Sequence, residues 1–172
     1  TIVAAALVLG AAASYAGDAM VYVVHGIPNV PVDVAVDGAC AIEGFMFGDQ
    51  VGPISLAPGT HVIRISLADA MDPCMGDVVL EAPVPFTDGE NATVIAYLTA
   101  MGMPTASKFP NDFSRPDPGT SRVIAHHCAA APPAYISVSR SPKAEFEPTV
   151  PGIANGEQVV EYFRPGAWSV AV

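Results

Sequence analysis

Apolar and polar residues alternate along the chain in short runs, and proline or glycine bounds most of these runs. In one run Val32, Val34 and Val36 fall on one side, whereas Asp33 and Asp37 fall on the other. A period of two is typical of a β-strand with one buried face. Beyond the N-terminal segment, helical periodicity never extends past a few turns. The pattern therefore predicts an all-β protein with negligible helix.

Further runs of β-branched and aromatic residues mark the other strands. Strands are predicted at Ala19–Val24, Pro31–Val36, Phe45–Phe47, Val51–Leu56, His61–Leu67, Val78–Leu80, Val84–Phe86 and Thr93–Leu98. Asp37-Gly38 and Pro58-Gly59 have the composition of tight turns. Short antiparallel strands at this spacing are typical of an immunoglobulin-like sandwich.

The pattern of the first strands returns near the end of the sequence. VYVVHGIPNVPVDVAVDG at 21–38 is followed later by RVIAHHCAAAPPAYISVS at 122–139. An internal repeat indicates a duplicated unit. In this alignment His25 corresponds to His126, Pro31 to Pro133, and Pro58-Gly59 to Pro165-Gly166.

The two copies differ in extent. After its Pro-Gly turn the first copy continues through several predicted strands, whereas the second copy has only a few residues. We expect two tandem sandwich domains, the second of them incomplete. The predicted division is an apolar N-terminal donor segment at 1–18, a first domain at 19–104, a proline-rich linker at 105–120 and a truncated second domain at 121–172.

Composition limits the classes of function. Apolar residues make up 51% of the chain and charged residues 14%, which is ample for a core. The net charge of −10 argues against binding to nucleic acid or to anionic membrane surfaces. Nucleophile elbow, HExxH, phosphate-loop and paired-carboxylate patterns are all missing from the sequence. We therefore expect a protein that is not an enzyme and needs no cofactor.

Three cysteines are the first candidates for special chemistry. In an extracytoplasmic protein, Cys40 and Cys74 are expected to form a disulfide within the first domain. Cys128 is then left over and suits a small buried position. In a strand, His126 and Cys128 would share a face but His127 would not, and two ligands are too few for a zinc site. No metal site is expected, and the histidines are expected to bond a neighbouring loop backbone.

Two loops carry further polar motifs. Asp69, Asp72 and Asp77 lie in one loop, but their spacing differs from that of an EF-hand, so a solvated loop is expected. Asn91-Ala92-Thr93 forms an N-x-[ST] sequon, which makes Asn91 a candidate glycosylation acceptor in a secreted chain.

Residues 20–100 resemble the family named domain of unknown function 4397, and residues 121–172 resemble it more weakly. The resemblance rests on VYVVHGIPNVPVDVAVDG followed by FGDQVGPISLAPGTHVIRI, and above all on the VVH histidine and the turn Leu56–His61. Arg164–Trp168 departs modestly from that turn in the second copy. The resemblance implies a secreted or cell-surface protein with duplicated immunoglobulin-like sandwiches. It carries no established activity, so it supplies no catalytic residues.

The N-terminal segment TIVAAALVLGAAASYA has three interpretations. It is the remnant of a secretory signal peptide with Ser14-Tyr15-Ala16 before the cleavage point, a membrane or pilin-like helix, or a strand buried on both faces. At 16 residues it is shorter than the stretch of about 20 that spans a membrane as a helix. In the strand interpretation the contacts are made by Ile2, Val3, Leu7, Val8 and Leu9.

These features together suggest a structural role. A sandwich that lacks strands exposes its core and an unpaired edge, and a spare apolar strand repairs both. We expect a subunit of an extracellular or cell-surface filament that polymerises head-to-tail with copies of itself by donor-strand complementation. The alternative is a monomeric surface module, attached to the cell or secreted, that binds a ligand or adheres.

Overall fold

The computed structural model describes residues 17–140 and 152–171, and β-strands are the only extended regular structure in that part of the chain. The strands are β1 (Ala19–His25), β2 (Val32–Val36), β3 (Ala39–Phe45), β4 (Gln50–Leu56), β5 (Gly59–Leu67), β6 (Val78–Phe86), β7 (Asn91–Leu98), β8 (Pro104–Pro110), β9 (Ser121–His127), β10 (Ser137–Ser139), β11 (Glu157–Phe163) and β12 (Ser169–Ala171). The all-β prediction is confirmed. The described residues contain no helix long and apolar enough to cross a membrane.

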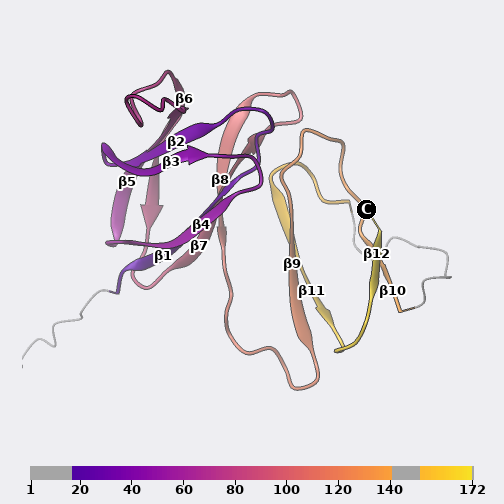
Figure 1. Cartoon of the computed structure of the whole chain (residues 1–172). Coiled ribbons are helices and arrows are strands. Elements are labelled where there is room, and N and C mark those ends of the chain that lie inside the picture. Colours follow the sequence, from indigo (N-terminus) through magenta and orange to yellow (C-terminus); the bar gives the residue numbers. More distant parts are fainter. Residues whose placement is uncertain (1–16, 141–151, 172) are drawn as a thin grey trace, which may run out of the picture.

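Strands β1 to β8 form a first sandwich of two four-stranded sheets (Figure 1). One sheet has the order β4-β1-β7-β8 and the other β3-β2-β5-β6. Between them pack the inward residues of both sheets. The centre of this core consists of Val32, Val34, Ile42, Phe45, Ile65 and Ala96. Burial of each large side chain contributes about 1.5–3 kcal/mol, so the alternating pattern of the sequence accounts for most of the stability of the sandwich.

The expectation of a wholly antiparallel sandwich is wrong at one pair of strands. β1 pairs antiparallel with β4 but parallel with β7, with Val21 opposite Ala92 and Val23 opposite Val94. A parallel pair requires a long connection. Here the connection runs through the whole second sheet, so β7 returns to β1 from the other layer. Strand patterns alone do not reveal this direction.

Several strand boundaries also differ from prediction. β3 ends at Phe45, the residue at which the predicted strand began. β3 begins immediately after the Asp37-Gly38 turn, and both turn residues have positive φ (50° and 81°). The two predicted strands at 78–80 and 84–86 are one strand, β6, which contains Pro83 and Pro85. β6 lies at a sheet edge, where a proline need not donate to a neighbour.

Asp33 lies on the outward face of β2 but is only 1% exposed. The loop between β5 and β6 covers it, and its carboxylate accepts backbone N–H groups from Gly44 (2.7 Å), Asp69 (3.2 Å) and Cys74 (2.9 Å). Burial alone raises the pKa of Asp33, but these three bonds outweigh it and hold the pKa below its usual value. The carboxylate thus anchors the loop to the sheet.

The disulfide secures the same loop. Cys40, on β3, is bonded to Cys74 with their Cα atoms 5.7 Å apart. Asp69 accepts N–H groups of its own loop from Met71 and Asp72, so it closes a turn at the surface.

The predicted linker at 105–120 is wrong in its first part. Residues 104–110 form β8, which pairs with β7 from Ala92↔Pro110 to Leu98↔Pro104. β8 is a partly exposed edge strand, so its sequence, PTASKFP, carries no clear apolar alternation.

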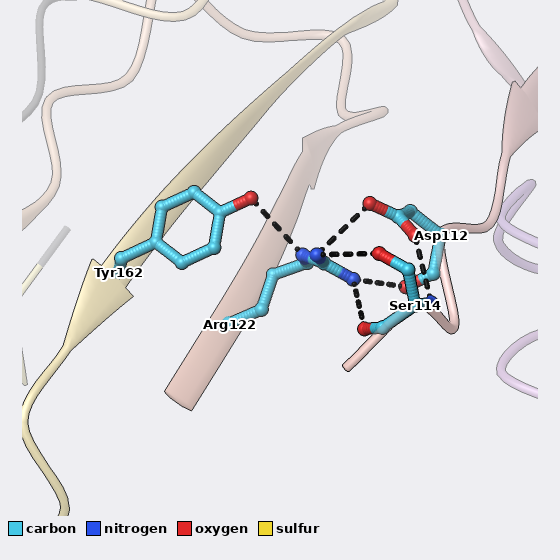
Figure 2. A network of polar contacts seen from close by, with 4 residues as sticks. All are labelled: Asp112, Ser114, Arg122 and Tyr162. Atoms are coloured by element: carbon cyan, nitrogen blue, oxygen red, sulfur yellow. Dashed lines mark hydrogen bonds and ion pairs between the residues drawn. The ribbon is translucent and has the colours of Figure 1, made fainter. Parts of the chain in front are cut away.

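The remainder of the predicted linker is tied to β9 by Arg122. Its guanidinium donates to the carbonyl oxygens of Asp112 (2.6 Å) and Ser114 (3.0 Å) and lies 3.0 Å from the Asp112 carboxylate (Figure 2). On its other side it donates to the hydroxyl of Tyr162 on β11 (3.2 Å). One side chain therefore joins the connecting loop to two strands beyond it.

Strands β9 to β12 form a second unit that packs against the outer face of β7 and β8. The rings of His126 and Phe109 lie 4.5 Å apart, and Cys128 packs on the cluster of Ile95, Tyr97 and Phe109. The side-chain amide of Asn155 donates to backbone carbonyls of both parts of the chain, at Leu98 and Ala129.

His61, near the start of β5, lies between two acceptors. Its Nδ1 is 2.6 Å from the Asp37 carboxylate and its Nε2 is 2.8 Å from the Ala57 carbonyl oxygen. Only a protonated ring donates from both nitrogens. The bond to Ala57, followed by that to Asp37, raises the pKa of His61.

This geometry predicts a pH dependence of stability. Because its folded-state pKa is raised, His61 contributes fully below its unfolded value of about 6.5, and the contribution is lost as pH rises through the folded pKa. We expect the thermal midpoint to fall as pH rises from about 6 to 9, and the variant His61→Phe to show a flatter slope over that range. Thermal unfolding at several pH values measures this dependence. The same slope of thermal midpoint against pH in wild type and variant would contradict the assigned role of His61.

Candidate functional site: an apolar groove in the second unit

The strands of the second unit repeat part of the first sandwich. β9 and β11 pair antiparallel, as β1 and β4 do, and β10 and β12 pair antiparallel, as β2 and β5 do. Gly59 and Gly166, which follow the matching prolines of the repeat, have similar φ values of 145° and 154°. In residues 121–140 and 152–171 the structure contains no counterpart of β6, β7 or β8.

One correspondence predicted from the repeat is wrong by a residue. Nε2–H of His25 donates to the Val30 carbonyl (2.7 Å) and Nδ1 accepts from the Ile27 N–H. His127, not His126, makes the equivalent bond to Pro132 (2.9 Å). The spacing of six residues from His25 to Pro31 matches His127 to Pro133, and this signal identifies the true counterpart. Two neighbouring histidines made the alignment ambiguous.

A groove of about 300 Å³ lies between the two strand pairs of the second unit. Its lining residues come from β9 and β11 on one side and from β10 and the turn before β12 on the other. Figure 1 shows where these strands lie. The apolar side chains that line the groove are Val123, Ala125, Ile136, Val138, Val159, Phe163, Pro165 and Trp168. Those on β9 and β11 occupy alternate positions, which point to the same face of a strand.

The same position in the first sandwich is filled. There Val21 and Val23 occupy the places of Val123 and Ala125, and the remaining space is only about 30 Å³. Side chains from two of the strands without a counterpart close that core, namely Phe86 on β6 together with Val94 and Ala96 on β7. Among the described residues, the groove therefore lacks the side chains that fill the equivalent position of the first sandwich.

The edge of β9 that faces away from β11 has no strand partner among the described residues. In the first sandwich the equivalent edge of β1 bonds to β7. An unpaired edge beside an apolar groove offers both main-chain hydrogen bonds and a hydrophobic contact to an extended peptide.

Aromatic and charged residues border the groove. The rings of Phe163 and Trp168 lie 5.3 Å apart, and Arg140 lies 4.7 Å from the centre of the Trp168 ring. Trp168 also donates its indole N–H to the carbonyl of Arg164 (3.0 Å), which fixes the ring at the groove mouth. Glu161 faces Val123 in the lining, where the first sandwich has Ile54 opposite Val21.

The residues singled out from the sequence lie in different places. Ile2, Val3, Leu7, Val8 and Leu9, the predicted polymerisation contacts, lie outside the described residues. Asn91 begins β7, and its side-chain oxygen accepts from the amide of Asn111 (2.9 Å). The groove residues were not predicted individually, although Val123 and Ala125 follow from the repeat once β9 is aligned with β1.

The His126-His127-Cys128 motif lies between the two units, apart from the groove. Burial lowers the pKa of His126 and raises the pKa of the free Cys128 thiol. Within 17–140 and 152–171, no three histidine, cysteine, aspartate or glutamate side chains converge to hold a metal ion.

Comparison with known proteins identifies the family. The curated proteins include none that matches this sequence. The sequence pattern of one family matches residues 19–136, which cover the whole first sandwich, β9 and the start of the second unit. The chain belongs to the family described as domain of unknown function DUF4397.

Proposed function

We propose that this protein is a structural subunit that assembles into an extracellular or cell-surface polymer, with an apolar strand of one subunit completing the second unit of the next. In this proposal the two units are tandem immunoglobulin-like sandwiches. The single observation that carries it is the groove of about 300 Å³ where the first sandwich has a filled core. The assembly is head-to-tail, and it requires neither catalysis nor a cofactor.

The occupant is the segment Thr1–Ala16 of a neighbouring copy. It carries no charged side chain, and each large apolar residue that faces the groove would gain about 1.5–3 kcal/mol on burial. As a strand at ~3.3 Å per residue it would reach about 50 Å, which exceeds the length of any strand in the second unit. Free N–H and C=O groups on β9 would pair with its backbone.

The position of β1 supports insertion between chains rather than within one. The start of β1 lies on the side of the first sandwich remote from β9 to β12 (Figure 1). The segment preceding Gly17 would have to cross the whole first sandwich to reach the groove of its own chain. A contact with the next copy avoids this crossing, and contacts of that type, when they do not close a ring, produce filaments.

The disulfide supports a location outside the cytoplasm. Disulfides between cysteines such as Cys40 and Cys74 persist in oxidising compartments and are rare in reducing ones. An extracellular or cell-surface polymer is consistent with this chemistry and with a net charge of −10, which disfavours nucleic acid as a partner.

Adjacent residues of β11 provide the test. Val159 lines the groove, whereas Val160 is on the opposite face and 39% exposed. The variant Val159→Asp should abolish assembly, because the inserted strand would bury an unpaired charge. The matched control Val160→Asp should still assemble. Light scattering after size-exclusion chromatography and negative-stain electron microscopy report the result.

Deleting residues 1–16 tests the donor. The truncated protein should be monomeric and should bind a synthetic peptide of that sequence, with protection of the second unit from protease. Filaments that persist in the truncated protein would overturn the assignment of the donor. If the protein with residues 1–16 present remains monomeric at high concentration, the proposal of a polymer is wrong and a monomeric adhesion module is favoured.

A further inference from the structure

The first sandwich also indicates how the inserted strand is oriented. We infer that Thr1–Ala16 of the neighbouring copy takes the place of β7: it runs parallel to β9 along the free edge of that strand, with Ala6, Val8 and Gly10 facing into the groove. This inference rests on the proposed function and specifies its contact at the level of residues.

Two strands of the first sandwich close the core, and their sequences differ in kind. β6, VVLEAPVPF, contains Glu81 and two prolines and lies at a sheet edge. β7, NATVIAYL, carries no charge and is buried on both faces from Val94 to Tyr97. The apolar segment 1–16 resembles β7 in this respect, since it has large and small apolar residues at both odd and even positions. Strands that are covered on both faces have such continuous apolar sequences, so the segment matches β7 rather than β6.

The direction follows from the pairing of β1 with its neighbours. β1 has β4 on one side, antiparallel, and β7 on the other, parallel. β9 pairs antiparallel with β11, and β11 is the counterpart of β4. A strand added to the remaining edge of β9 in the orientation of β7 is therefore parallel to β9.

The register follows from the inward residues of β7. Ala92, Val94 and Ala96 face the core, a small-large-small order that leaves room for the opposing sheet. In segment 1–16 the run Ala6-Leu7-Val8-Leu9-Gly10 repeats that order, with a β-branched residue between two that are no larger than alanine.

The opposing residues on β9 can then be assigned. In the first sandwich Val21 lies opposite Ala92, Val23 opposite Val94 and His25 opposite Ala96. The counterparts of these three on β9 are Val123, Ala125 and His127, respectively. Ala6 is therefore placed opposite Val123, Val8 opposite Ala125, and Gly10 opposite His127.

Cysteine cross-linking of the full-length protein tests direction and register together. Neighbouring strands lie about 4.8 Å apart, which is compatible with the Cα separation of about 4.4–6.8 Å in disulfides. All variants carry Cys128→Ser, which removes the free thiol. The pair Ala6→Cys with Val123→Cys is expected to cross-link between chains upon mild oxidation, giving a ladder on a non-reducing gel that collapses to monomer on reduction. The pair Gly10→Cys with Val123→Cys, which an antiparallel strand with Val8 opposite Ala125 would join, is expected to give no ladder.

A third pair, Val8→Cys with Ala125→Cys, checks the site without regard to direction, because these positions oppose each other in both orientations. Ladders from Gly10→Cys with Val123→Cys and from this third pair, with none from Ala6→Cys, would overturn the parallel orientation, whereas a ladder from Gly10→Cys alone would overturn the register. No ladder from any pair, with filaments still visible by electron microscopy, would overturn the register while leaving assembly intact. Absence of filaments in the Cys128→Ser parent and the unmodified protein would overturn the proposed function itself.

Discussion

Replacing Asp33 with alanine is expected to lower the free energy of unfolding of the first sandwich by on the order of 4 kcal/mol. The carboxylate accepts three backbone N–H groups, one from β3 and two from the loop between β5 and β6, and alanine accepts none. Each buried donor left without a partner costs about 1–3 kcal/mol. The bond to Cys74 is fully buried, whereas those to Gly44 and Asp69 are partly buried, so water recovers part of the loss at the latter two.

Urea unfolding at neutral pH measures the effect, and Asp33→Asn refines it. In the better of its two orientations the amide oxygen still accepts from Asp69 and Cys74, as Oδ2 does, and the N–H₂ group then faces the N–H of Gly44. We expect part of the loss to persist in this variant. The matched control is Asp69→Ala, which removes the same side chain from the surface of the loop and should cost less than about 1 kcal/mol. Equal losses in Asp33→Ala and Asp69→Ala would contradict the account.

The loss of stability at acid pH provides a second measure of the contribution of the Asp33 carboxylate. Because its folded-state pKa is lowered, Asp33 contributes stability above its unfolded pKa of about 3.9, and the contribution is lost as pH falls through the folded value. The wild-type protein should therefore lose stability on acidification below about pH 4 more steeply than Asp33→Ala does.

Removing the disulfide is expected to produce a loss of similar size. Cys40 and Cys74 are 34 residues apart, and closing an interval of that length contributes about 3–4 kcal/mol in the chain-entropy description. The double variant Cys40→Ser, Cys74→Ser should lower the free energy of unfolding by that amount. The control is Cys128→Ser, which removes the thiol that is not in the bond and should have a much smaller effect.

The two losses should not add. Asp33 and the disulfide both hold the loop between β5 and β6, through the backbone and the side chain of Cys74, respectively. Once one anchor is removed the loop is partly released, so removing the second costs less than it does alone. A double-mutant cycle measures the difference. Strict additivity would show that the anchors act on independent parts of the fold.

Much of the first sandwich could be predicted from its sequence, because alternation and turn composition act locally. Val32, Val34 and Val36 identify β2, and Asp37-Gly38 identifies the turn that follows. β8 was not predicted because its residues between Pro104 and Pro110 are mostly half-exposed and polar. Polar residues of this kind are common in an edge strand that has one face in contact with solvent. The buried state of Asp33 could not be predicted, since the loop that covers it comes from more than thirty residues away.

The groove residues could likewise be predicted only in part from the sequence. The internal repeat indicated an incomplete second copy, and the structure gives it four strands with a defined alignment. Which residues face the groove depends on register, and the repeat was one residue out at His126 and His127. Two neighbouring histidines left the alignment ambiguous, and the six-residue spacing from His25 to Pro31, repeated from His127 to Pro133, is the sequence signal that resolves it. The structure agrees, since His127 makes the bond to Pro132 that matches the bond of His25 to Val30.

The parallel pairing of β1 with β7 has a consequence for how the protein folds. Met20 pairs with Asn91, so the sheet that contains β1 closes only after nearly all of the first sandwich has been synthesised. Contacts so distant in sequence slow folding, and until they form β1 keeps one unpaired edge beside an uncovered core. A chain at that stage would have β1 to β6 without β7, and the strands β9, β10, β11 and β12 of the second unit match β1, β2, β4 and β5 of that set. Among the described residues, the second unit thus lacks the same closing strand as a first sandwich that β7 has not yet joined.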